Sequence, residues 1–139
     1  MPLDRGTRNY ALFLLALVVG LTALALYQPP VVRELNAKLE SDPEVSAFPY
    51  PFRVLRVEGR TAIMSTPRSS AVPVARVLGL LFPEVAGLAD DAPAFRAAQE
   101  RLAQVQKRAA RLVTDDPRIQ GVRWQLDRDW LVQHGLPPN

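Results

Sequence analysis

The stretch FRVLRVEGRTAIMSTP, residues 52–67, carries the clearest β-strand pattern in the chain. Its first half is rich in valine and leucine, and Thr61–Thr66 resumes the strand pattern after a short polar break. Gly59 lies at the break, where a tight turn favours glycine because glycine has no β-carbon. The stretch therefore predicts a β-hairpin that turns at Glu58, Gly59 and Arg60.

Helical patterns flank this hairpin on both sides. Valine and leucine residues share one face of Val31–Glu40, and Ala94–Val113 repeats apolar residues at spacings of three and four. The segment VRWQLD, residues 122–127, alternates in the manner of a half-buried third strand, and residues 127–134 predict a last short helix. We expect a small α+β domain of order αββααβ, whose three-stranded antiparallel sheet is packed by helices.

The expected core draws on all of these elements. The loop SAFPYPF, residues 46–52, holds three aromatic residues and is expected to seal one end of the core. The residues expected to be buried are Leu35, Leu39, Leu55, Val57, Ile63, Leu102, Val105, Leu112, Val122, Trp124 and Leu126. These positions suit one layer of helices on one face of a sheet.

An apolar run precedes the domain. Tyr10–Tyr27 contains no charged side chain, and at about 1.5 Å per residue it reaches roughly 27 Å, close to the thickness of a bilayer core. Arg5 and Arg8 precede the run, and basic residues favour the cytoplasmic side of a membrane. We expect a bacterial inner-membrane protein with a single pass: a cytoplasmic tail at 1–9, a transmembrane signal-anchor helix at 10–28 and a periplasmic domain at 31–139.

The same run has a second interpretation, as a cleaved secretory signal. Ala23 and Ala25 satisfy the small-residue rule for a cleavage site. However, the apolar run continues through Leu26 and Tyr27 and is longer than an ordinary signal core. The length favours an uncleaved anchor and leaves cleavage open.

Composition narrows the chemistry that we expect. The chain has no cysteine, which excludes disulfides, thiolate metal sites and cysteine nucleophiles. His134 is its single histidine, and no spacing links it to a nucleophile and a carboxylate. The net charge of +3 is too small to indicate nucleic acid as a partner. We therefore expect no catalytic residues, no cofactor, no metal site and a protein that is not an enzyme.

Three segments together resemble the BON-domain family, small αββαβ modules of bacterial periplasmic and outer-membrane-associated proteins. They are RELNAKLESDPEV at 33–45, RVLRVEGRTAIMS at 53–65 and RAARLVTDDPRIQGVRWQL at 108–126, separated by an insertion at 71–93. Gly59 falls where that family turns its hairpin, whereas Ser65 stands where the family often has a second glycine. The resemblance implies a binding or scaffold module that acts near lipid and brings no catalytic residues.

Basic residues gather on one face of the longest soluble helix. Arg101, Lys107, Arg108 and Arg111 lie off its apolar stripe. A solvated helix face explains them, and so does contact with anionic phospholipid headgroups, where each basic side chain contributes on the order of 1 kcal/mol. We retain these four residues as candidate lipid contacts.

The insertion contains AVPVARVLGLLF, residues 71–82, with Arg76 as its only charged residue. Such a segment must cover its apolar surface, either in the core of the domain or against another protein. Leu80 and Phe82 lie off the face shared by the other large side chains, which makes them candidate partner contacts. The alternative function is therefore an accessory or assembly subunit of an inner-membrane protein complex.

The length of the apolar run yields the first testable prediction. The protein isolated from cells should retain its N-terminal residues and remain with the inner-membrane fraction after a carbonate wash, because a spanning helix resists extraction. Intact-mass spectrometry measures this directly. A chain that begins at Leu26 would instead demonstrate cleavage after Ala25.

Overall fold

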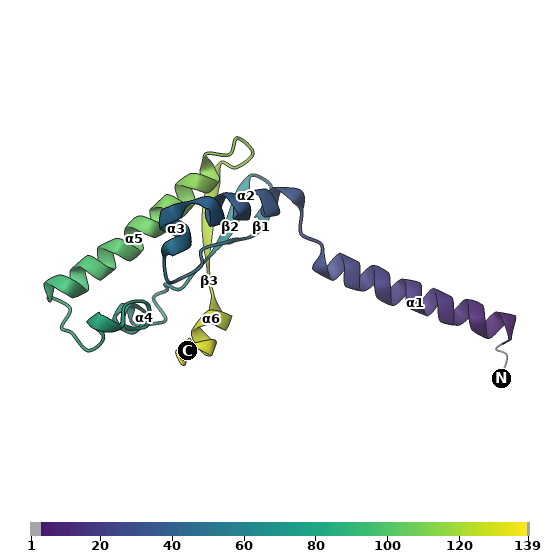
Figure 1. Cartoon of the computed structure of the whole chain (residues 1–139), viewed down its shortest axis with the longest axis horizontal. Helices are drawn as coiled ribbons and strands as arrows, with labels where there is room; N and C mark the ends of the chain where they lie inside the picture. The colour runs from purple at the N-terminus through teal and green to yellow at the C-terminus, as the bar shows by residue number, and fades with distance from the viewer. Residues whose placement is uncertain (1–3, 139) are drawn as a thin grey trace. The chain divides into compact units, whose positions relative to one another are not determined.

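The structure, a computed structural model, describes residues 4–138 and divides into two compact units at Pro30 and Val31. The first unit contains α1 (Arg5–Leu26), none of whose residues is buried (Figure 1). Within residues 4–138, α1 is the one helix long and apolar enough to cross a membrane, by length and composition alone. A signal sequence near the N-terminus has the same properties, so the helix is compatible with both interpretations of the apolar run.

The second unit is built on the expected hairpin. The strands β1 (Val54–Glu58) and β2 (Thr61–Thr66) pair antiparallel, and Gly59 makes the turn with a φ of 61°. This backbone conformation strains any residue that carries a β-carbon. The pairing shifts between Val54 and Arg56, which leaves Leu55 as the extra residue of a bulge.

The third strand corrects the expectation of an antiparallel sheet. β3 (Gly121–Leu126) pairs with β2 in parallel, in a sheet of order β1-β2-β3. The physical reason is the long connection between them, which contains the helix α5 (Pro93–Thr114). A helix that runs back across a sheet returns the chain to the starting end of the preceding strand, so the next strand points the same way.

Helices pack against one face of this mixed sheet. α2 (Pro30–Ser41) and α5 contribute buried apolar residues to the same cluster as Val54, Ala62 and Met64 of the sheet. A five-residue helix, α3 (Pro43–Ala47), follows α2 directly, and the sequence had indicated only a helix end there. Pro43 ends the first helix but is well tolerated in the first turn of the next, where its missing N–H has no intrahelical partner.

The insertion at 71–93 belongs to the same core. It forms α4 (Val74–Leu81) and a short 3₁₀ helix, η1 (Pro83–Val85). The side chains of Val77, Leu78 and Leu81 are buried. Simple core burial therefore accounts for most of the apolar surface of this segment.

The expected core is confirmed in part. Leu35, Leu39, Ile63, Leu102 and Val105 are buried as expected. The expected core residues that are only half-buried are Leu55, Val57, Leu112, Val122, Trp124 and Leu126. Most of these lie on β1 or β3, the two edge strands, where neighbouring elements cover only part of each side chain.

The aromatic loop seals the core as expected and does so through ring contacts. Phe48, Tyr50 and Phe52 are buried. Phe52 stacks on Phe48, with centroids 5.8 Å apart, and packs edge-on against Tyr50 and Trp124. This cluster joins the loop to β3 through Trp124. Tyr50 connects it to α6 (Arg128–Gln133), because Trp130 packs edge-on against Tyr50.

A buried carboxylate ties α3 to α5. Arg108 Nε donates to both carboxylate oxygens of Asp42, at 2.7 and 2.8 Å, and Asp42 is only 6% exposed. The hydrogen bond from Arg108 holds the pKa of Asp42 below its ordinary value of 3.8. A carboxyl group with a lowered pKa in the folded state stabilises the fold above its ordinary pKa, and this stabilisation is lost as the pH falls through the lowered value.

This pair yields a prediction about acid stability. At pH 7 the wild-type protein should unfold at higher urea concentration than Asp42→Asn, because the variant cannot form the charged pair. The difference should shrink as the pH falls below about 4, where the wild-type carboxylate also becomes protonated. Urea titrations monitored by circular dichroism at pH 7 and at a pH below about 4 test this. A stability difference that is the same at both would contradict it.

Candidate functional site

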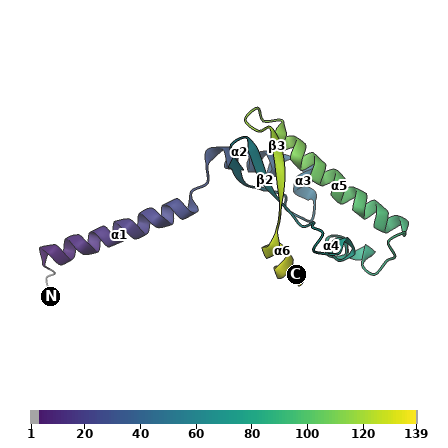
Figure 2. The ribbon, with the colours of Figure 1, turned by 180° about the vertical axis from the view of Figure 1, so that it is seen from behind.

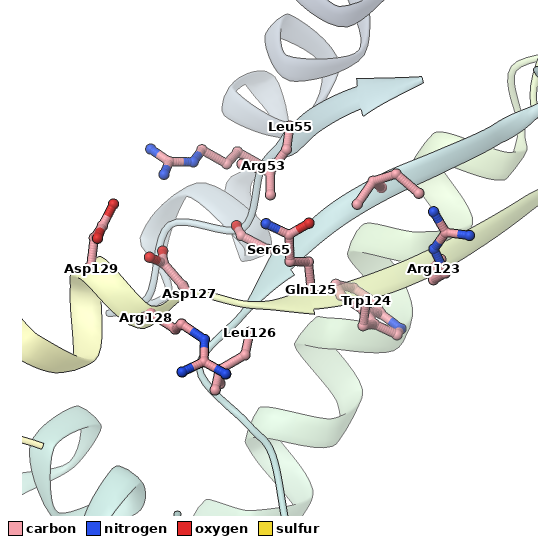
Figure 3. A pocket seen from close by; sticks show the side chains of 11 residues that line it. Arg53, Leu55, Ser65, Arg123, Trp124, Gln125, Leu126, Asp127, Arg128 and Asp129 are labelled. Atoms are coloured by element: carbon pink, nitrogen blue, oxygen red, sulfur yellow. The ribbon is translucent and has the colours of Figure 1, made fainter. Parts of the chain in front are cut away.

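The face of the sheet opposite the helices bears a hollow. Leu55 and Ile63 lie on this face, apart from the helix-side core. The hollow has a volume of about 620 Å³ and lies between the sheet and the start of α6 (Figure 3). The residues that line it are Arg53, Leu55, Ile63, Ser65, Arg123, Trp124, Gln125, Leu126, Asp127, Arg128 and Asp129.

A polar network crosses this open face from β1 to β3. Glu58 accepts a hydrogen bond from Arg56 Nε at 2.8 Å and one from Arg123 Nη2 at 2.6 Å. Arg56 Nη1 also donates to Gln125 Oε1 at 3.0 Å. Hydrogen bonds from Arg56 and Arg123 lower the pKa of Glu58. The network therefore bridges both edge strands over β2, and Ile63 on β2 is only 1% exposed.

A buried phenol in the core contacts Asp127, one of the residues that line the hollow. Tyr50 is fully buried, and its hydroxyl donates to Asp127 Oδ2 at 2.9 Å. Burial raises the pKa of Tyr50 strongly, and the Asp127 carboxylate raises it further. The neutral phenol therefore acts as a fixed hydrogen-bond donor. Asp127 Oδ1 also accepts from the backbone N–H of Trp130 at 3.1 Å and so caps α6.

The hydroxyl of Ser65 is the unsatisfied group of this hollow. Ser65 is 1% exposed, yet within residues 4–138 its Oγ makes no hydrogen bond. The Ser65 hydroxyl opposes the rise in the pKa of Tyr50. Within residues 4–138, however, no partner meets the distance and angle of a hydrogen bond to Ser65 Oγ. An unpaired buried hydroxyl costs free energy, and the Ser65 hydroxyl lies buried beneath the hollow.

Charge surrounds the mouth of the hollow. In the described part of the chain, the side chains of Arg53, Arg128 and Asp129 make no ion pair or hydrogen bond, although all three line the hollow. The site can therefore offer two free guanidinium groups, a free carboxylate and an apolar floor. Within the same described residues no cluster of three or more metal-ligating side chains occurs. The arrangement suits binding of a polar group.

The structure separates the four basic residues of the long helix. Arg101, Lys107 and Arg111 are exposed, and no ion pair involves them among the described residues. Arg108 is instead committed to Asp42, with Glu44 a second carboxylate at 3.8 Å. Three of the four candidate lipid contacts are therefore available at the surface, whereas Arg108 links α5 to Asp42 at the start of α3.

The two candidate partner contacts also differ. Leu80 is 37% exposed and borders a shallow apolar hollow. Phe82 is half-buried and packs edge-on against Phe48, with ring centroids 5.8 Å apart. Leu80 is free to meet a partner, and Phe82 belongs mainly to the aromatic cluster.

Sequence reasoning did not identify the hollow. Arg53, Ser65 and Asp127 come from three segments that meet only in the folded sheet. The available signal was the alternation in β3, which assigns Val122, Trp124 and Leu126 to the core and hence Arg123 and Gln125 to the opposite face. The bulge at Leu55 and the unpaired hydroxyl have no counterpart in the pattern of residue types.

Comparison of the chain with models of known protein families, with curated proteins and with solved structures finds no match. The functional argument therefore rests on the geometry of the chain itself.

The contrast between Leu80 and Phe82 yields a prediction for two matched variants. Phe82→Ser should lower the free energy of unfolding by about 2 kcal/mol, because a half-buried ring leaves the cluster. Leu80→Ser should change it by less than about 0.5 kcal/mol, as expected for an exposed side chain. Urea unfolding of both variants measures this, and equal losses would show that Leu80 is part of the core.

Proposed function

We propose that this chain is a membrane-anchored periplasmic binding module that acts beside the lipid surface. The observation that carries the proposal is that the apolar helix and the folded domain form two separate units. The domain at 31–139 closes its core without α1, and α1 buries none of its apolar residues within the protein. An apolar helix with no protein surface to cover it finds its natural environment in a bilayer.

The topology follows from charge. Arg5 and Arg8 stand at the start of the helix, which supports a cytoplasmic N-terminus and a periplasmic domain in a bacterial inner membrane. Only Tyr27–Pro29 separate α1 from α2. This short connection supports a role for the domain near the membrane that holds α1.

The resemblance to BON domains fits the same role. The order α2-β1-β2-α5-β3 is the αββαβ order that the resemblance implies, with α4 and η1 as the insertion. That family suggests a binding or scaffold role near phospholipid. The hollow on the open face of the sheet, with the free guanidinium groups of Arg53 and Arg128, is the binding surface that we propose.

Contact with anionic headgroups is the lipid component of this proposal. Arg101, Lys107 and Arg111 are exposed on α5 outside its row of buried residues, and Lys107 also borders the small hollow that Trp124 of β3 lines. A helix face with free cations gains on the order of 1 kcal/mol per basic side chain near an anionic surface. Arg108 contributes less, because Asp42 already neutralises it.

A single label can test this contact, since the chain has no cysteine. We expect an environment-sensitive fluorophore on Gln104→Cys to shift to shorter wavelength when nanodiscs holding the full chain contain phosphatidylglycerol rather than phosphatidylcholine alone. The shift should weaken with salt and disappear in the Arg101→Glu/Arg111→Glu variant, because the attraction is electrostatic. A label on Gln133→Cys in α6 is the control. Identical spectra in both lipids at Gln104→Cys would rule out the headgroup contact.

A second candidate function, an accessory subunit of an inner-membrane complex, is favoured by one surface. Leu80 borders a hollow of about 400 Å³ with Gly79, Ala86 and Leu136, and its lining is mainly apolar. An apolar hollow at the surface suits a protein contact. Loss of a copurifying protein in Leu80→Ser, with the fold intact, would support this candidate.

A further inference from the structure

One edge of the sheet is left open. Ser65 N–H donates to the carbonyl of Arg53, the residue before β1, so the alternate residues of β2 turn their backbone groups toward β3, and Asp127 N–H donates to Thr66 O. By the regular alternation of a parallel ladder, Gly121, Arg123 and Gln125 then turn their backbone groups toward β2. The N–H and C=O groups of Val122, Trp124 and Leu126 point away from the sheet. None of these groups has a hydrogen-bond partner among residues 4–138.

The opposite edge of the sheet is capped at its start and interrupted by a bulge. The Asn36 side chain donates to Val54 O at 3.0 Å and accepts from Val54 N–H at 2.7 Å, which satisfies both backbone groups. The bulge between Val54 and Arg56 further interrupts that edge. Bulges and covered edges are the usual protection against unwanted strand pairing. β3 has neither a bulge nor a proline, and Figure 2 shows it in front of β2 with no other element before it.

The surroundings of the open edge are basic and partly apolar. On the helix side, Arg68 and Lys107 flank the half-buried ring of Trp124 in a hollow of about 170 Å³. On the other face, Arg123 and Arg128 border the larger hollow. Arg68, Lys107 and Arg128 make no ion pair in the described part of the chain, and the two carboxylates that line the larger hollow, Asp127 and Asp129, make none either.

We propose that the β3 edge binds an extended acidic segment of a partner protein as a fourth strand. This inference rests on the proposed binding role of the domain and names the partner of its sheet. Strand addition supplies main-chain hydrogen bonds, and alternate side chains of the added strand reach the two faces. Apolar side chains of the added strand would pack on Trp124 on the helix side, and the alternate acidic side chains would face Arg128 on the other side.

Charge decides against a second copy of this chain as the occupant. An antiparallel pair of two β3 edges centred on Trp124 would bring Arg68 and Lys107 of one copy toward those of the other. Like charges that face each other across paired strands are destabilising. An acidic strand has the complementary charge.

The test uses the full chain in phosphatidylcholine nanodiscs and a fluorescent synthetic peptide in which acidic residues and valines alternate. Anisotropy should show binding to the wild-type protein and to Val122→Ala. The Kd for Val122→Pro should be at least about tenfold higher, because proline removes one outward N–H and the corresponding hydrogen bond. A peptide with lysine in place of each acidic residue should not bind.

Each remaining outcome is informative. A fully N-methylated acidic peptide should fail to bind the wild-type protein, which tests strand addition even if Val122→Pro does not fold. Equal binding by Val122→Pro and Val122→Ala with both folded, or binding of the N-methylated peptide, would overturn strand addition. So would the absence of any peptide binding, or a dimer that Val122→Pro dissociates. Failure of the anchor would appear instead as protein released by the carbonate wash, independently of the peptide.

Discussion

The fold depends on the need to enclose one strand, β2. All of its residues except Thr61 are buried, so both faces and both edges of the strand must be covered. The hairpin covers one edge with β1, and the crossover through α5 covers the other with β3. The helices cover one face. On the other face, Ile63 and Ser65 lie beneath polar and charged side chains of the two neighbouring strands.

This unequal covering explains where the candidate site lies. The helix side is closed by apolar packing, with Leu102, Val105 and Ala109 of α5 buried completely. The open side is closed by the ion pairs of Glu58 with Arg56 and Arg123, which are exposed and stabilise the fold only modestly. A surface covered by exposed polar side chains can accept a ligand at lower cost in free energy than a packed core. The unpaired hydroxyl of Ser65 and the free backbone edge of β3 lie on or beside this less protected surface.

The insertion changes what the domain can present. α4 and η1 fill space beside α5, and their buried side chains extend the core. They leave Leu80 at the surface, and Phe82 joins the ring cluster that starts in the loop before β1. The insertion therefore extends the core through Phe82 and leaves the apolar side chain of Leu80 exposed.

The sequence by itself determined the local elements. Glycine at the turn, the apolar period of the two long helices and the alternation in β3 defined the hairpin, the helices and the third strand, because these signals depend only on residues close in the chain. The length of the apolar run defined a helix able to span a membrane. Only the tertiary structure decided the parallel pairing of β3, the half-burial of Trp124, the commitment of Arg108 to Asp42 and the hollow beneath Arg53 and Asp127. Each of these depends on residues distant in sequence, whose meeting is set by the path of the chain and by the packing of whole elements.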